Sequence, residues 1–255
     1  MATSPRLDAA YVAQVKAVRA RVEAFALTRF AAGQHRDADL ERFVRQVVPV
    51  VLAGRRQVSS LTDAYLSRVL GVRSLGPIDT DLLRGVAAAE VYSRPFVTVR
   101  TKLSEGLAYD AAISAGVARL TDITLTDMQL AKTHTTRSVY RSAGVTRYVR
   151  TLSGSKNCAL CYLASTQTYA SGDLLPIHPG CDCGTAPVEA GMRKVMDANL
   201  TATHEAVEDR LGESDSGARA PDYRKQLIVV EHGEMGPLLA VRGQHHQGRS
   251  VMDAN

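Results

Sequence analysis

Residues 157–184 read NCALCYLASTQTYASGDLLPIHPGCDCG and hold all four cysteines of the chain. A C-x2-C pair, Cys158 and Cys161, precedes an H-x2-C-x-C string formed by His178, Cys181 and Cys183. Thiolates and imidazoles are the usual ligands of structural zinc sites, and C-x2-C is a common first half of such a site. The stretch therefore predicts a small zinc-clamped module, with a redox-active dithiol as the alternative.

Five donors compete for the four positions of a tetrahedral ion. A tight turn would bring Cys158 and Cys161 to one side, and extended residues two apart point the same way, so Cys181 and Cys183 can both reach the ion. We expect Cys158, Cys161, His178 and one of the last two cysteines to bind zinc. An all-cysteine set, with His178 behind it, is the alternative. A closed set of protein ligands leaves no position for an activated water, so the metal is predicted to be structural.

Composition limits the class of protein. The chain has 255 residues, 45% of them hydrophobic, which is enough for a sizeable core. A net charge of +5 tolerates polyanions but is modest for a dedicated nucleic-acid binder, and the absence of tryptophan leaves few stacking platforms. The charged N-terminus and the lack of an apolar run near ~18 residues predict no membrane contact. In a cytoplasm, where thiols stay reduced, clustered cysteines favour metal binding.

Residues 1–144 are predicted to form a helical domain, because apolar residues recur at helical spacing. The pattern predicts a helix from residue 7 to 30, a second from Asp37 or Asp39 to Gly71 with a kink or restart at Pro49, and a third from Asp79 or Thr80 through residue 92. A further helix is expected to begin at Pro95. The last, within residues 108–143, is expected to carry a cap at Thr126.

The character of the sequence changes after residue 144. Residues 145–154 alternate and are β-branched, which predicts a strand leading into the cysteines. We expect a small α+β zinc-knuckle module at 145–211, with short helices at 189–199 and 204–211. Residues 212–255 are expected to form a linker, a short strand at 223–230 and a flexible tail. The fold class is thus a mainly α N-terminal domain, a small α+β zinc-knuckle module and a flexible C-terminal tail.

The sequence does not favour a catalytic metal. Zinc deaminases of nucleobases combine H-x-E with a later P-C-x-x-C. His232 and Glu234 form an H-x-E string, but it follows the cysteines, and Asn157 rather than proline precedes Cys158. A zinc-dependent hydrolase or deaminase acting on nucleic acid remains the enzymatic alternative, and we assign no catalytic residue.

The strings CALCYLAS and GDLLPIHPGCDCG together resemble the C-terminal domain of the phage Mu F-like minor head proteins, most closely those of tailed phages of actinobacteria. The resemblance covers residues 147–187. Cys158, Cys161, His178, Cys181 and Cys183 fall on the family pattern, with residue 182 in its variable slot. The helical N-terminal half agrees with the family's general layout.

This resemblance implies a minor capsid protein that acts in head morphogenesis at or near the portal, without enzymatic activity. The implied partners are the portal protein or the major capsid protein. Non-specific contact with genomic DNA is an accompanying expectation, and a genome-binding virion protein is an alternative function. No small-molecule substrate is implied. The implied location is the capsid interior or the portal vertex, after assembly in the host cytoplasm.

Overall fold

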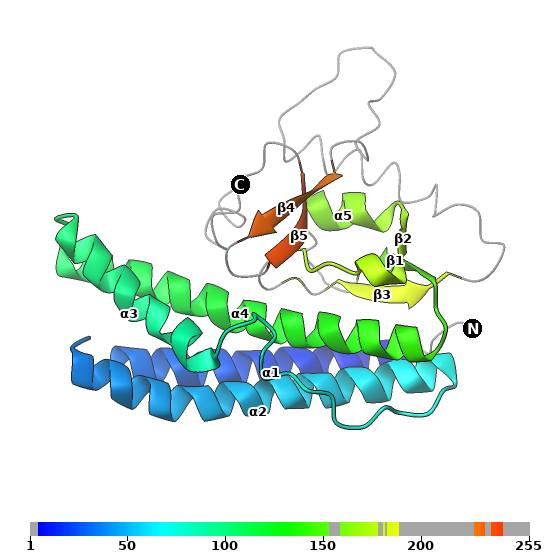
Figure 1. The fold of residues 1–255 in the computed structure, drawn as a ribbon, viewed down its shortest axis with the longest axis horizontal. Coiled ribbons are helices and arrows are strands. Elements are labelled where there is room, and N and C mark those ends of the chain that lie inside the picture. Colours follow the sequence, from blue (N-terminus) through cyan, green and yellow to red (C-terminus); the bar gives the residue numbers. More distant parts are fainter. Residues whose placement is uncertain are drawn as a thin grey trace, which may run out of the picture.

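The computed structural model describes residues 5–152, 159–177, 181, 183–188, 227–232 and 236–241. Four long helices form the N-terminal part, and a small group of strands with one short helix lies over them (Figure 1). The long helices are α1 (Pro5–Ala31), α2 (Asp37–Leu70), α3 (Ala88–Ser104) and α4 (Tyr109–Ser142). The predicted fold class, a helical N-terminal region followed by small strands and a cysteine cluster, is confirmed.

Aromatic rings join the first three helices in the core. The ring of Phe30 packs edge-to-face on Phe43 and on Phe96, with ring centroids 5.8 and 5.1 Å apart. Gly116 of α4 lets the helices approach here, because a Cβ atom at this position would lie 2.5 Å from Cγ2 of Val99. The apolar faces predicted from helical spacing therefore meet in one close-packed core.

Some predicted helix boundaries are wrong. Helix α2 continues through Pro49 without a restart, and α3 begins at Ala88 and continues through Pro95. Residues 71–87 are turns and irregular backbone, so the helix expected to begin at Asp79 or Thr80 is absent from this part of the described chain. The end of α2 is as expected, with Gly71 in the left-handed region at φ 66°.

Side chains of α2 hold the irregular segment 71–87. The carboxylate of Asp63 accepts hydrogen bonds from the hydroxyl of Ser74 at 2.5 Å and from the backbone N–H groups of Leu75 and Gly76 at 3.1 Å. Burial raises the pKa of Asp63, but these hydrogen bonds outweigh it and leave the pKa below the ordinary value. Further along, Arg55 donates to the carbonyl oxygen of Thr80 at 3.1 Å. Side chains of α2 thus form hydrogen bonds with backbone N–H and carbonyl groups of this segment, groups that in a helix would bond to one another.

A buried ion network ties α4 to this segment. Asp127 is fully buried, with Oδ2 2.6 Å from Nη2 of Arg55 and Oδ1 2.7 Å from Nε of Arg84. The hydroxyl of Tyr92 donates to Oδ2 at 3.1 Å, and burial together with the Asp127 charge raises the pKa of Tyr92, so this hydroxyl stays protonated. The cap expected at Thr126 is wrong, since α4 is continuous and its residue 127 serves this network.

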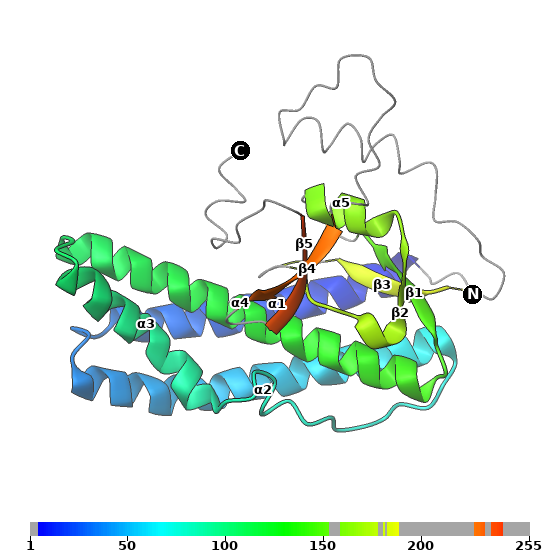
Figure 2. The same cartoon turned by 45° about the horizontal axis from the view of Figure 1, so that its top comes forward.

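The C-terminal module is built on α4. Its sheet has the order β2-β1-β3 and is antiparallel throughout. The elements are β1 (Arg147–Thr151), α5 (Ala159–Ser165), β2 (Thr168–Ala170), the short 3-10 helix η1 (Ser171–Asp173) and β3 (Gly184–Pro187). Residues 123–131 of α4 are all buried. In Figure 1 the module lies above α4, and α1 and α2 lie below it; Figure 2 gives a second view of the same arrangement.

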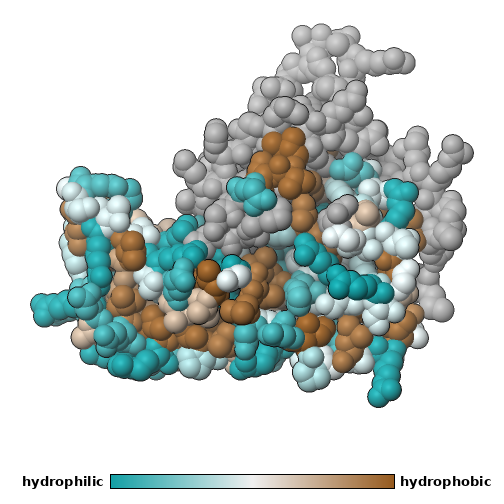
Figure 3. Space-filling view, viewed as in Figure 1, coloured by the Kyte–Doolittle hydropathy of each residue, from teal (hydrophilic) through white to brown (hydrophobic). Residues whose placement is uncertain are grey.

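A β-hairpin completes the module. Strands β4 (Leu227–His232) and β5 (Gly236–Val241) pair antiparallel. The strand expected at 223–230 is confirmed with shifted ends, whereas β5 was not expected, because we assigned that segment to a flexible tail. Apolar atoms gather over this hairpin in Figure 3, and Val229 of β4 is 59% exposed. The short helices expected at 189–199 and 204–211, and the linker at 212–222, lie outside the described residues.

Within the described part of the chain, the helices are too short or too polar to cross a bilayer.

Candidate metal centre

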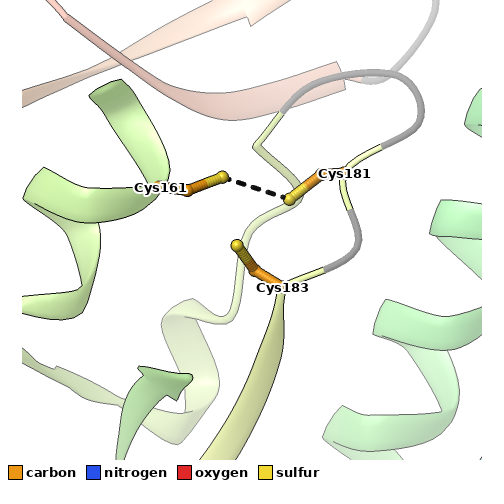
Figure 4. A group of neighbouring side chains, drawn as sticks. All are labelled: Cys161, Cys181 and Cys183. Carbon is orange, nitrogen blue, oxygen red and sulfur yellow. Dashed lines mark hydrogen bonds between the residues drawn. The ribbon is translucent and has the colours of Figure 1, made fainter. Parts of the chain in front are cut away.

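Three of the predicted ligands meet in the module. Cys161 projects from α5, and Cys181 and Cys183 lie just before β3 (Figure 4). Their sulfur atoms all lie within 4.8 Å of one another, and those of Cys161 and Cys181 are 3.5 Å apart. The expectation that Cys181 and Cys183 can both reach one ion agrees with this grouping of sulfur atoms. These three cysteines can hold a metal ion.

The spacing of the sulfur atoms suits a shared ion. An ion about 2.3 Å from each sulfur in a tetrahedral site requires sulfurs roughly 3.8 Å apart. The distance between Cys161 and Cys181, 3.5 Å, is close to that value. A disulfide would need about 2.05 Å. The arrangement therefore fits ligands around one centre better than an oxidised pair.

Cys158 and His178 lie outside the described residues, so the structure does not place them. Each precedes a clustered cysteine by three positions, Cys158 before Cys161 and His178 before Cys181. Either donor would complete a set of four.

Cys183 lies directly before β3, whose first residue, Gly184, has no room for a side chain. Gly184 follows Cys183 and pairs with Thr151 across β1 and β3. A Cβ atom at position 184 would lie 2.6 Å from Oγ1 of Thr151, well inside van der Waals contact. Glycine is therefore required for β3 to approach β1 closely, and this approach positions Cys183 beside Cys161.

Two arginines hold the segment that leads to residue 178. Nε of Arg137, on α4, donates to the carbonyl oxygen of Leu174 at 2.8 Å. Arg150, on β1, donates to the carbonyl oxygen of Leu175 and lies 5.8 Å from the ring centroid of Tyr169. Both guanidinium groups thus fix backbone carbonyls on the path from η1 to the second half of the cysteine string.

Apolar residues cover the three sulfurs. The cysteines are only 3–4% exposed, and they pack in one cluster with Leu160, Ile177 and Leu239. The N–H of Leu239 donates to the carbonyl oxygen of Pro176 at 3.2 Å, which attaches β5 to this cluster. Sequence reasoning missed Leu239, although the apolar runs LIVV and LLAV, separated by a glycine-containing segment, are typical of a hairpin.

The helical bundle also reaches the cluster. Nζ of Lys132, on α4, donates to the carbonyl oxygen of Cys183 at 2.8 Å. The hydroxyls of Tyr140 and Thr185 are 2.9 Å apart and add a second contact between α4 and β3. No local pattern in the sequence marks Lys132, since the residues it joins are distant along the chain.

Thiolates are soft donors that bind zinc, copper(I) or iron–sulfur clusters in preference to magnesium or calcium. A buried ion held by thiolates from α5 and from the entry to β3 would cross-link these elements, which share only a small apolar cluster. The arrangement therefore suits a metal that stabilises the module.

Comparisons of the chain with protein-family models, with curated proteins and with solved structures found no match.

Proposed function

We propose that the protein is a minor head protein of a tailed phage whose C-terminal module is held by one structural zinc ion. The observation that carries the metal assignment is the meeting of three buried thiols, from both halves of the cysteine string, within 4.8 Å. The resemblance of that string to the phage Mu F-like minor head proteins supports the virion role. We propose zinc because sulfur donors with a nearby imidazole candidate suit it best.

The proposed ligands are Cys161, Cys181 and Cys183, completed by Cys158 or His178. The fifth donor then hydrogen-bonds behind the site or remains outside it. We propose no catalytic residue. The three cysteines are buried, with only 3–4% of each exposed, which supports a structural role. A catalytic ion has to accept substrate or water from outside.

The metal assignment is tested by elemental analysis of the full chain purified from cells under reducing conditions. We expect one zinc per chain. Replacement by cobalt(II) should give intense visible bands typical of four fixed ligands with several thiolates. A protein without bound metal, or a cobalt spectrum typical of five or six ligands, contradicts the proposed centre.

The virion role is tested separately. We propose attachment to the portal or the major capsid protein, with only non-specific contact to genomic DNA. Mass spectrometry of purified virions of the encoding phage should find the chain at low copy number, and cross-linking should join it to portal or capsid subunits. Its absence from both virions and assembling heads contradicts the role, whether or not zinc is bound.

A further inference from the structure

The proposed zinc centre carries a charge that the fold must balance. Three thiolates and one divalent ion sum to −1 with a neutral histidine as fourth ligand, and to −2 with a fourth thiolate. An uncompensated charge is costly to bury. The cysteines are at most 4% exposed, so water solvates them poorly and the protein itself must supply counter-charge.

The face of the bundle next to the cysteines is basic. A small pocket between α1 and α4 reaches Cys181, and its lining includes Lys16 and Arg19 of α1 and Lys132 of α4. All three cationic residues are partly buried. Cationic side chains of the bundle therefore line the same pocket as Cys181, one of the proposed ligands.

Lys132 connects this face to the centre directly. Its ammonium group donates to the carbonyl oxygen of Cys183 at 2.8 Å, so its position is coupled to the backbone of a proposed ligand. One cation on α4 thus links this helix to the segment directly before β3. Lys16 and Arg19 line the same pocket from the neighbouring helix α1.

We propose that this basic face, formed by Lys16, Arg19 and above all Lys132, is the charge-compensating half of the metal centre. Metal binding and docking of the module on the bundle are then coupled. Metal strengthens docking, and docking strengthens metal binding by the same factor, as linkage requires. Lys132 is a positioning residue, since it acts through the ligand backbone and through its charge. This inference rests on the proposed zinc site.

The test compares Lys132→Met with Lys102→Met in the full chain. Lys102 of α3 pairs with Glu105 at 2.7 Å and does not line the pocket, so it controls for loss of one positive charge. Zinc affinity is measured by competition with a chromophoric chelator. Loss of a residue that supports a ligand typically weakens affinity about 10–100-fold, and we expect Lys132→Met to fall in that range while Lys102→Met stays at the wild-type value.

Two further readouts separate charge compensation from simple packing. In cobalt-substituted protein, the thiolate-to-metal bands of Lys132→Met should shift to lower energy, because loss of a nearby cation raises the energy of the sulfur electrons. Lys132→Arg should keep both the band position and the affinity. If Lys132→Met does not fold, the Lys16→Met/Arg19→Met double variant serves instead, with a smaller loss of affinity expected.

The outcomes distinguish the two proposals. If the wild-type protein binds no metal, the proposed zinc site fails. If it binds zinc and the Lys132 and pocket variants bind with unchanged affinity and unchanged cobalt bands, the zinc site stands and charge compensation by the bundle is overturned. Hydrogen exchange adds a check on coupling, since chelation should increase exchange in β3 and leave α2 and α3 unchanged.

Discussion

The bundle and the C-terminal module each contain one buried polar centre, and the two centres are built in opposite ways. In the bundle, Asp127 is neutralised by Arg55 and Arg84, with Tyr92 as a further donor. In the module, three cysteines gather among apolar residues, with their sulfur atoms within 4.8 Å of one another. The first centre is composed of protein groups that satisfy one another, and the second is composed of donors that suit a cation.

This difference indicates how each half is stabilised. The bundle has long helices and a continuous apolar core, so its ion network adds order to a structure that packing already supports. The module has short strands and a small core around the cysteines. A region of that size commonly needs a metal or a disulfide to fold. We therefore expect stability of the module, but not of the bundle, to depend on metal.

Chelation of the metal should have the largest effect. We expect loss of ordered structure in the module, because binding of a structural zinc is worth on the order of 10 kcal/mol and is the folding energy of such modules. Cys181→Ser should have the same result, since it removes one of three clustered ligands. The measurement is hydrogen exchange in β1 and β3 with and without chelator, alongside circular dichroism of the helices. Equal loss of structure in both halves would argue against separate stabilisation.

Removal of the buried carboxylate should have the next largest effect, and on the other half. Asp127→Asn keeps the shape but leaves the charges of Arg55 and Arg84 uncompensated, which typically costs about 3–5 kcal/mol. Urea unfolding of the helices measures this cost, and zinc affinity should stay within about twofold.

Asp81→Asn is the matched control for that variant. The carboxylate of Asp81 is 3.6 Å from Arg56, and both side chains are more than half exposed. An exposed pair of this kind contributes at most about 1 kcal/mol. Similar losses of unfolding free energy in the two variants would show that burial does not increase the contribution of the network to stability.

Sequence reasoning succeeded where the signal is local and periodic. Helical spacing predicted the faces that form the core, and the C-x-C string predicted that Cys181 and Cys183 could both come within reach of one ion. It failed where side chains that are distant in the sequence form hydrogen bonds with backbone groups. Arg55 donates to the carbonyl oxygens of Thr80 and Asp81, where a helix was expected and the backbone is irregular. Pro95 predicted the start of a helix, but it lies inside α3, which begins at Ala88.

The contacts around the cysteine cluster can be divided in the same way, into those that the sequence indicated and those that it did not. The hairpin that includes Leu239 is visible in the sequence as two apolar runs near a glycine, but only the first run was predicted as a strand, and the second was assigned to the tail. Lys132 was not predictable, since its contact with residue 183 follows only from how the module sits on α4.

Weakening the apolar cover should have a moderate effect confined to the module. Leu239 is 7% exposed and packs in the cysteine cluster, so Leu239→Ala should cost about 2–3 kcal/mol, in the lower part of the range for such truncations. It should also speed the transfer of zinc to a chelator, because the sulfurs become more accessible. Val229→Ala changes the same hairpin at a residue that is 59% exposed, and there we expect less than about 0.5 kcal/mol. Equal zinc transfer rates in the two variants would mean that β5 does not cover the site.

The smallest effect is expected from crowding the strand pair that positions Cys183. Gly184→Ala places a methyl group 2.6 Å from Oγ1 of Thr151, so β3 has to move from β1, at a cost of about 1–2 kcal/mol. Thr151→Ala removes the opposing atom, and the double variant should recover most of the loss in a double-mutant cycle. The bundle should be unaffected, since neither residue belongs to its core cluster. Thermal unfolding of the zinc-loaded protein measures all three variants. Additive losses would show that Gly184 is needed for some reason other than its approach to Thr151, whereas recovery ties the geometry of the metal centre to one close contact between two strands.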